Sequence, residues 1–492
     1  MSRIAIVDTT LRDGQQSLWA YRMRAEAMLP TTRDLDEAGY EGIEFVMPSA
    51  QFPRAVRDLD ENPWDWVNLG APAFTRTQLR MHGGVTKRFR SVPDCVQVLY
   101  LQRMVSLGIT VTRTSDPWND FEEFRWSKET LAAHGMRTVV NLIYSVSPRH
   151  TLDYYAQKTR DAVALDPYRI CVKDVGGLLT PETARPFIAT VVANAGGVPL
   201  EFHGHCNNGF GPYAALIAAD EGISTIHTAI PPLADASSLP SVFDVVPNLR
   251  ARGHDVQVDL ERLERVRSHF HVVADREDLP VGRPQPFRED LYTHQIPGGM
   301  ISNLRFQLSQ IGAEHRLEET LQEASRVRQE LGYPIMVTPL SQFVGSQAAI
   351  NVLSPERYAN VTDEVIEYAL GLWGREAPTV MDQDIRDRIL DRPRARELAS
   401  AAEHDDSPSL DEVRHRHGPG VTDDELITFY YVGRPATRPP SAPGDLPTTY
   451  DEYLSAHMPL VELVRRLGSA PGSRRLRVVT AEGELTMTTG TT

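Results

Sequence analysis

The chain has 492 residues, a hydrophobic content of 41% and a formal net charge of −15. This length predicts two or three domains with a large apolar core, and no apolar run reaches the roughly 18 residues that a membrane span needs. The acidic balance argues against nucleic acid as a partner, because phosphate backbones require basic surfaces. The chain starts directly with a predicted strand, and its three cysteines are unevenly spaced. We therefore expect a cytoplasmic protein without disulfides.

Short β-branched segments alternate with amphipathic helical segments from residue 4 to about residue 253. The eight predicted strands cover residues 4–8, 42–46, 79–82, 109–116, 137–144, 169–174, 200–205 and 224–230. Eight strand–helix units predict a (β/α)8 barrel, a TIM barrel of the α/β class, as a catalytic domain over residues 1–278. A doubly wound open sheet would alternate in the same way, but the count of eight and the lack of a GxGxxG motif after the first strand disfavour it.

Polar side chains stand at the ends of five predicted strands, where the active sites of such barrels lie. They are Arg12 and Asp13 after the first strand, His82 at the third, Arg113 and Asp116 at the fourth, Lys173 and Asp174 at the sixth, and His203 and His205 at the seventh. Any one of them alone could form a salt bridge at the barrel rim. Their convergence from five strands predicts an active site.

His203 and His205 are the most informative pair among these residues. They are two positions apart in a predicted strand and therefore point to the same face. Two imidazoles on one face make half of a metal site, which still needs an oxygen ligand. A pair of this kind alone is a weak signal, because most such histidines are exposed or hydrogen-bonded. Asp13 is the best candidate for the oxygen ligand.

After about residue 280 the pattern becomes helical. A turn-rich segment at 290–299 precedes predicted helices over 302–331, 341–353 and 363–373, which form a second domain over residues 279–393. Residues 394–492 are predicted to be a partly flexible tail with an acidic stretch at 403–406 and a Pro-rich linker at 434–447. Two short segments, 475–480 and 484–488, predict a C-terminal hairpin.

Three motifs in this order resemble a known family. Residues 8–17 (DTTLRDGQQS) resemble the strand-one signature of the carboxyltransferase domains of pyruvate carboxylase, the oxaloacetate decarboxylase α subunit and transcarboxylase. These belong to the metal-dependent barrels that also include hydroxymethylglutaryl-CoA lyase. Residues 171–181 (CVKDVGGLLTP) are similar to the strand-six motif of the family, and 294–304 (HQIPGGMISNL) to a second-domain motif of the decarboxylase. The resemblance covers about residues 3–390.

The resemblance implies a metal site and its chemistry. Asp13, His203 and His205 would bind a divalent ion, with zinc expected and cobalt or manganese as alternatives, and Lys173 would add a fourth ligand after carbamylation by carbon dioxide. The ion would polarise the 2-oxo group of a substrate and stabilise the enolate formed as a carboxyl group leaves or arrives.

The resemblance also implies residues around the metal. Arg12 and Gln16 would orient the substrate, Arg113 would join them in substrate binding, and Ser237 would move a proton between the carrier and the substrate. His82 stands where the family has an arginine that binds the substrate carboxylate. This difference indicates a different acid or pH-sensitive binding.

No biotin-attachment tetrapeptide of the AMKM kind occurs in the sequence. If biotin takes part, we expect it on a separate carrier protein that is served by a biotin carboxylase, and by resemblance we expect a homodimer. Two other interpretations stay open. The chain could be a biotin-independent decarboxylase or C–C lyase of specialised metabolism, or a non-catalytic scaffold.

Overall fold

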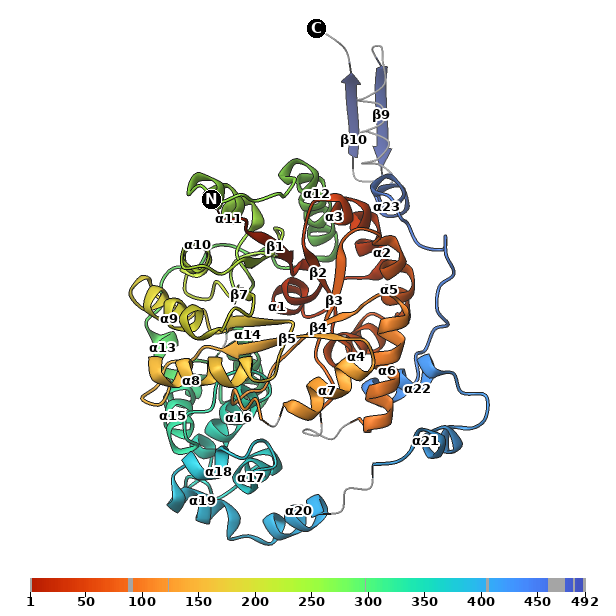
Figure 1. Ribbon diagram of the computed structural model, residues 1–492. Coiled ribbons are helices and arrows are strands. Elements are labelled where there is room, and N and C mark those ends of the chain that lie inside the picture. The colour runs from red at the N-terminus through yellow and green to blue at the C-terminus, as the bar shows by residue number, and fades with distance from the viewer. Residues whose placement is uncertain are drawn as a thin grey trace.

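A computed structural model describes residues 2–86, 92–122, 124–296, 298–403, 407–458, 474–480 and 483–489. Eight parallel strands form a closed barrel in chain order, and β1 pairs with both β2 and β8 (Figure 1). The strands are β1 (Ala5–Asp8), β2 (Gly42–Val46), β3 (Gln78–His82), β4 (Val111–Thr114), β5 (Arg137–Ile143), β6 (Arg169–Asp174), β7 (Leu200–Gly204) and β8 (Thr225–Thr228). The predicted (β/α)8 barrel is confirmed.

Helices follow the strands and, apart from η1 at the barrel mouth, surround the barrel. They are η1 (Thr10–Gly14), α1 (Gln15–Trp19), α2 (Ala25–Met28), η2 (Leu29–Thr31), α3 (Thr32–Glu37), α4 (Pro48–Asp58), α5 (Pro63–Gly70), η3 (Ala71–Ala73), α6 (Asp94–Ser106), α7 (Arg125–Ala133), α8 (Leu152–Val163), α9 (Pro181–Asn194), α10 (Gly211–Asp220), α11 (Val242–Ala251) and α12 (Leu260–Glu277). In α8, Tyr155, Thr159 and Ala162 are buried at helical spacing, and the Thr151 side chain caps the first turn. This one-sided burial holds α8 against the barrel.

At the ends of β4 and β6, aspartate side chains accept hydrogen bonds from the backbone of the loops that follow. The strand predicted over 109–116 is shorter, because the Asp116 carboxylate accepts hydrogen bonds from the backbone N–H groups of Trp118 and Asp120 at 2.8 and 2.9 Å. In the same way, Asp174 at the end of β6 accepts the N–H groups of Leu178 and Leu179, both at 2.9 Å. These two aspartates therefore shape the loops beside the barrel mouth.

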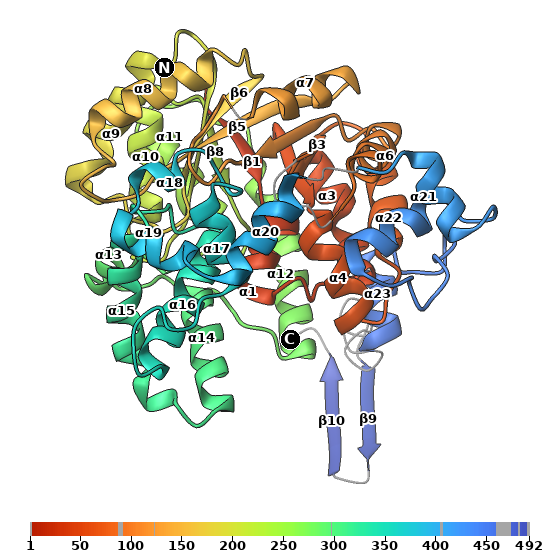
Figure 2. The ribbon, with the colours of Figure 1, turned by 90° about the horizontal axis from the view of Figure 1, so that it is seen from below.

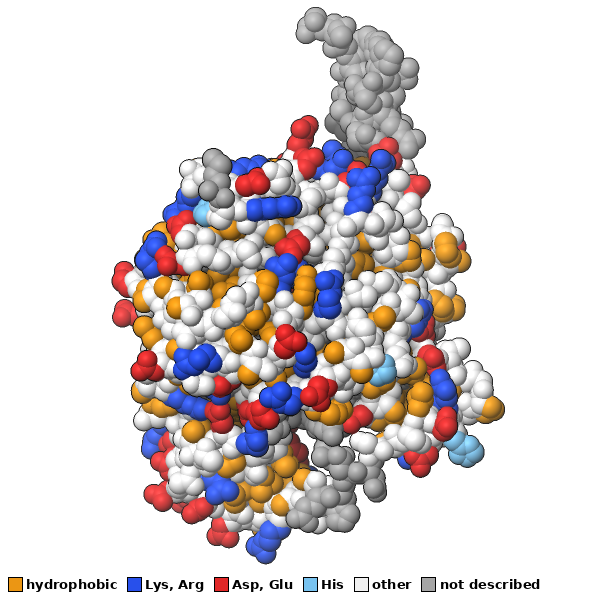
Figure 3. All heavy atoms as spheres, viewed as in Figure 1, with side chains coloured by type: hydrophobic (Ala, Val, Ile, Leu, Met, Phe, Trp, Pro, Cys, Tyr) orange, Lys and Arg blue, Asp and Glu red, His pale blue; other side chains and the backbone are white. Residues whose placement is uncertain are grey.

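A helical region follows the barrel and has its own apolar core around Phe343, Tyr368 and Trp373. Its elements are α13 (Asp290–His294), α14 (Gly298–Gln310), η4 (Glu314–Arg316), α15 (Leu317–Glu330), α16 (Leu340–Leu353), α17 (Asp363–Leu370), α18 (Ala377–Val380), α19 (Gln383–Leu390) and α20 (Pro393–Glu403). The single helix predicted over 302–331 is instead two helices, with Gly312 at positive φ (70°) between them. On the face shown in Figure 3, acidic and basic side chains are interspersed over both the barrel and this region.

The chain then returns to the barrel. Helix α21 (Leu410–His417) leads to α22 (Asp423–Val432), which packs against α4 and α6, and α23 (Tyr450–His457) contacts η2 (Figures 1 and 2). The indole N–H of Trp64 donates to the Thr428 hydroxyl at 2.9 Å, and the Asp65 carboxylate accepts the Ser441 hydroxyl at 2.8 Å. The segment predicted as a Pro-rich linker is thus tied to the barrel.

The last described elements are β9 (Arg474–Thr480) and β10 (Gly483–Thr489), which pair in an antiparallel hairpin as predicted. Among the described residues, every helix is too short or too polar to cross a bilayer.

Candidate active site and metal centre

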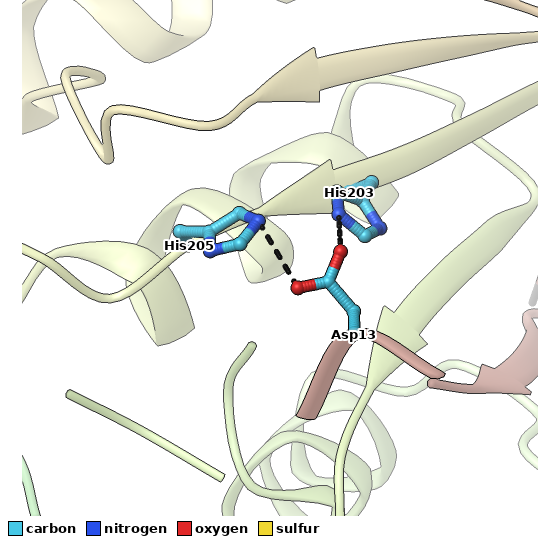
Figure 4. A group of neighbouring side chains, drawn as sticks. All are labelled: Asp13, His203 and His205. Atoms are coloured by element: carbon cyan, nitrogen blue, oxygen red, sulfur yellow. Dashed lines mark ion pairs between the residues drawn. The ribbon is translucent and has the colours of Figure 1, made fainter. Parts of the chain in front are cut away.

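The three residues predicted to begin the metal site meet at the C-terminal end of the barrel strands (Figure 4). Asp13 lies in the π-helical turn η1, His203 lies on β7, and His205 follows that strand. The Nε2 atom of His203 is 3.2 Å from one carboxylate oxygen of Asp13, and Nε2 of His205 is 3.6 Å from the other. One ligand atom from each residue lies within 4.8 Å of the other two. The carboxylate and the two imidazoles therefore face a common point.

The turn that carries Asp13 is set by its neighbours. The Asp8 carboxylate at the end of β1 accepts hydrogen bonds from the Thr10 hydroxyl at 2.6 Å and from its N–H at 3.1 Å. Gly14 allows the turn to lie against the loop after β8, because a Cβ atom there would be 2.9 Å from the carbonyl oxygen of Leu233. Local π-helical geometry is often found at functional sites, and here it directs Asp13 towards β7.

Both histidines use Nδ1 for a protein contact and turn Nε2 towards Asp13. Nδ1 of His205 lies 2.6 Å from the carbonyl oxygen of Ser237, which can only accept a hydrogen bond, so Nδ1 carries the proton and Nε2 has a free lone pair. Nδ1 of His203 lies 3.0 Å from His227. Nε2 of His203 is buried and faces the Asp13 carboxylate at 3.2 Å. A buried imidazole that turns one nitrogen towards a carboxylate, with its ring held by a second contact, fits a metal ligand.

Asp13 is held in its ionised form. Burial raises the pKa of its carboxyl, but Arg12, His205 and His203 outweigh that effect and keep the pKa well below its usual value. Nη2 of Arg12 is 2.7 Å from the Asp13 carboxylate. The Ser17 hydroxyl donates a further hydrogen bond at 2.9 Å. The site therefore presents one anion and two neutral imidazoles, a donor set that zinc and other divalent transition metals accept.

Lys173 lies beside this group. It is opposite His203 in the register of β6 and β7, and no described residue forms a hydrogen bond or an ion pair with its amine. Burial, together with the nearby cations Arg113 and Arg12, lowers the pKa of Lys173 to about 7. Since Asp174 is bonded to the loop after β6, it does not act as an ion-pair partner. Lys173 is thus a buried amine that is partly neutral near pH 7.

A carboxylate below the mouth joins two arginines. Glu44 on β2 accepts a 2.9 Å hydrogen bond from Nε of Arg12 and a 3.0 Å hydrogen bond from Nη2 of Arg113. Arg113 also donates to the Asn141 side chain at 3.1 Å. Because Arg113 is fully buried and bonded to both partners, contact with a substrate would require it to exchange them. Arg12 reaches from this pair to Gln16, at 3.2 Å.

The remaining predicted residues border the same space. The Gln16 carbonyl accepts hydrogen bonds from Arg12 and from the Tyr21 hydroxyl, at 3.0 Å for Tyr21. His82 ends β3, and burial together with Arg12, Arg113 and Lys173 holds its pKa well below the usual value, so it is neutral. Its Nδ1 is buried without a hydrogen bond among the described residues. The Ser237 hydroxyl donates to the Ser17 carbonyl at 3.0 Å.

Sequence reasoning missed Glu44, Glu201 and His227, which lie inside the barrel and contact the predicted residues. A signal for Glu201 was present, because it stands two positions before His203 and so shares its face of the strand. His227 occupies the corresponding inward position on β8. Buried polar residues in strands that otherwise hold β-branched side chains would have marked all three.

The fold and the site define a (β/α)8-barrel enzyme with a helical second region. A family model described as a conserved carboxylase domain matches residues 291–432, and an HMGL-like model matches residues 123–269. The chain belongs to the carboxyltransferase domain family of pyruvate carboxylase, the oxaloacetate decarboxylase α subunit and transcarboxylase, as its relatives show.

Three comparisons support this assignment. A pyruvate carboxylase subunit of Methanocaldococcus jannaschii is 35% identical over 79% of this chain and 68% of its own length. The methylmalonyl-CoA carboxyltransferase 5S subunit of Propionibacterium freudenreichii is 29% identical over 75% of this chain and 74% of its own length. The carboxyl transferase domain of Rhizobium etli pyruvate carboxylase has the same fold, with a TM-score of 0.77 and 22% identity over 99% of this chain and 84% of that structure. The resemblance predicted from the motifs is confirmed, and the chain is an enzyme of the carboxyltransferase and decarboxylase class.

Proposed function

We propose that this enzyme moves a carboxyl group to or from a 2-oxo acid or a related enolisable carboxylate, as the carboxyltransferase component of a biotin-dependent complex. One observation carries the proposal: Asp13, the Nε2 atoms of His203 and His205 that face it, and the amine of Lys173 border one space at the barrel mouth. The Lys173 amine has little value for stability there, because a buried polar group without a partner costs free energy. It is useful if the groups bind ligands.

Asp13, His203 and His205 would hold a divalent ion together with the carbamate of Lys173. We propose zinc, with cobalt or manganese as alternatives, because the set combines imidazole nitrogens with carboxylate-type oxygens. A protonated lysine cannot coordinate a metal. The pKa of about 7 supports a neutral amine that reacts with carbon dioxide and so becomes an anionic oxygen ligand. The bound ion would supply Lewis-acid chemistry at the oxo group of the substrate.

The side chains around this space would orient the substrate. Arg12 offers the cationic group closest to the metal ligands, and the NH2 group of Gln16 is available because its carbonyl is the atom bonded to Arg12 and Tyr21. His82 adds a neutral imidazole that can hydrogen-bond to a carboxylate or hydroxyl. We also propose Arg113 as a substrate-binding residue, which would have to release its hydrogen bonds to Glu44 and Asn141 in order to contact the substrate. Arg113 then supports Arg12 through Glu44.

Ser237 would carry the proton between the carboxyl carrier and the substrate. Its carbonyl oxygen lies 2.6 Å from Nδ1 of His205, which fixes the loop after β8 next to the metal ligands. Its hydroxyl would have to leave the Ser17 carbonyl in order to act. A rotation about one side-chain bond achieves this exchange.

The proposed partners follow from the reaction class. Carboxybiotin would arrive on a carrier protein, and a biotin carboxylase would load it. We expect a homodimer, as in the related barrels, and a cytoplasmic location, since Cys95, Cys171 and Cys206 are free thiols.

The test is carbon dioxide release from oxaloacetate, and from a panel of other 2-oxo acids, by the purified chain with added divalent metal. Free biotin serves as the acceptor. Release that depends on both biotin and metal supports the proposal, and no release with any acid under these conditions contradicts it. Release without biotin favours the second candidate, a biotin-independent decarboxylase or lyase, for which the neutral His82 at the substrate position is the supporting observation.

A further inference from the structure

A buried tyrosine that the proposed mechanism does not use lies beside Gln16. Helix α1 ends in two residues with positive φ, Ala20 at 50° and Tyr21 at 60°. The backbone N–H of Tyr21 donates to the carbonyl of Gln15 at 3.0 Å, which closes the end of the helix. This reversal brings the tyrosine ring back to the side chain of Gln16, and only 4% of Tyr21 is exposed.

Positive φ is costly for a residue with a side chain, because Cβ crowds the backbone carbonyl. Glycine is the usual residue at such angles, and a bulky side chain is rare there. The end of α1 places Ala20 and Tyr21 in this region in succession. Backbone conformations of this kind concentrate at functional sites, where the position of the side chain is what matters. The conformation therefore directs attention to what the Tyr21 side chain contacts.

The Tyr21 hydroxyl holds the side chain of Gln16. It donates to Oε1 of Gln16 at 3.0 Å, and Nη1 of Arg12 donates to the same oxygen at 3.2 Å. Because a guanidinium has no acceptor, the Gln16 atom between Arg12 and Tyr21 must be the carbonyl oxygen. The Met47 sulfur, 3.5 Å from the same hydroxyl, is a much weaker acceptor. Two donors thus fix the orientation of the amide.

This orientation leaves the amide NH2 of Gln16 for other contacts. No described residue forms a hydrogen bond with Nε2, and Gln16 is partly exposed whereas Tyr21 is buried. An amide NH2 only donates, so it binds acceptors such as a carboxylate, a carbonyl or an enolate oxygen. A flipped amide would present its oxygen, which repels all three.

We propose that Tyr21 is a positioning residue that fixes the Gln16 amide as a hydrogen-bond donor to an oxygen of the substrate, and so favours substrates with an acceptor at that point. The inference rests on the proposed substrate role of Gln16 and deepens it. Tyr21 itself is too deeply buried to touch the substrate, so it acts through Gln16.

A double-mutant cycle separates this role from a general effect on packing. Tyr21→Phe keeps the ring and removes the hydroxyl, and Gln16→Met keeps the approximate shape and removes the amide. If Tyr21 acts through Gln16, the loss of the hydroxyl matters only while the amide is present. Tyr368→Phe is the matched control, because Tyr368 is also buried and its hydroxyl donates one hydrogen bond, to the Leu331 carbonyl at 2.7 Å.

Turnover is measured with the 2-oxo acid that the wild type converts, with metal and biotin present. We expect Tyr21→Phe to lower kcat/KM about 5-fold, the effect of one hydrogen bond. Adding Tyr21→Phe to Gln16→Met should change kcat/KM by less than about 2-fold, and Tyr368→Phe should match the wild type within the same margin. A further loss of about 5-fold in the double variant overturns the inference, because Tyr21 would then act independently of Gln16.

A second measurement needs no substrate. The side-chain amide of Gln16 is assigned in ¹⁵N-glutamine-labelled protein by its loss in Gln16→Met, and its ¹⁵N relaxation reports its order. We expect an order parameter of about 0.85 in the wild type, as for a rigid group, and below about 0.6 in Tyr21→Phe. An amide that is mobile in the wild type, or equally ordered in both proteins, contradicts the inference. Failure of the wild type to convert any 2-oxo acid would instead contradict the proposed function, and the relaxation measurement would still decide the role of Tyr21.

Discussion

At the barrel mouth, Asp13 of η1 and His205 after β7 are held by neighbouring groups, whereas His82 of β3 and Lys173 of β6 are not. Asp13 is bonded to Arg12 and Ser17, and His205 is bonded to the loop after β8. By contrast, His82 has a buried nitrogen without a hydrogen bond among the described residues, and no described residue pairs with the amine of Lys173.

This difference indicates that the two groups of residues have different roles. Ligands that must bind an ion tightly gain from being fixed in advance, since little conformational entropy is then lost on binding. Groups that wait for carbon dioxide or a substrate must keep a bonding position open. We therefore expect changes on the η1–β7 side to affect metal retention, and changes on the β3–β6 side to affect modification, substrate binding and turnover.

The largest effect should come from Lys173→Arg, which keeps the charge but cannot form a carbamate. We expect kcat/KM to fall by at least about 100-fold, the order of the loss on removing one electrostatic stabiliser from an active site. The circular dichroism spectrum should not change. Lys158→Arg is the matched control, since Lys158 forms an ordinary ion pair with Glu376 at 2.6 Å.

Lys173→Ala also tests whether Lys173 supplies an oxygen ligand, because a short carboxylic acid together with added metal can fill the vacated oxygen position. We expect partial recovery of turnover. A Lys173→Arg variant with near wild-type activity would remove the carbamate from the mechanism.

Carbamylation itself should depend on pH. Because the pKa of Lys173 is about 7 in the metal-free protein, the neutral fraction of the amine should rise about tenfold from pH 6 to pH 8. A lysine with its ordinary pKa would remain almost wholly protonated over this range. The carbamate signal after incubation with ¹³C-labelled carbon dioxide at fixed dissolved concentration should rise accordingly in ¹³C NMR. The same signal in Lys173→Arg would assign it to another amine.

His82→Leu should weaken substrate binding with little effect on the metal. Loss of one hydrogen bond to the substrate costs about 1 kcal/mol, or roughly a 5- to 10-fold rise in KM. Metal content by elemental analysis should remain that of the wild type, and His134→Leu, away from the mouth, serves as the control. If His82→Leu loses the metal, the division between the two sides of the mouth is wrong.

The smallest effect is expected far from the mouth. Trp64→Phe removes the hydrogen bonds to Thr428 and to the Asp424 carbonyl that attach α22 to the barrel. The free energy of unfolding should fall by about 1–2 kcal/mol, measured by urea denaturation, and zinc affinity should not change. A change in zinc affinity would show that the returning segment influences the site.

Much of this architecture could be predicted because it follows from short-range rules. Short β-branched segments between helical segments identified the eight strands, and the spacing of His203 and His205 placed both imidazoles on one face. The helix predicted over 363–373 is shorter, because Gly371 at positive φ (86°) ends α17 after Leu370.

Long-range contacts could not be predicted in this way. The attachment of α22 to Trp64 joins residues 364 positions apart, and nothing near Thr428 indicates its partner. The hydrogen bond from Arg80 to Glu201 joins β3 to β7 across the barrel, between residues 121 positions apart. Such networks are set by barrel closure, which brings strands together in space irrespective of their distance in sequence.

The most direct test of the metal centre is elemental analysis of the purified chain beside the His203→Ala/His205→Ala double variant. The geometry predicts about one divalent ion per wild-type chain and almost none in the double variant, with both proteins folded by circular dichroism. A double variant in which both alanines replace exposed histidines, His315→Ala/His415→Ala, should keep the ion. Full retention of the ion without His203 and His205 would place it elsewhere and contradict the proposed metal centre.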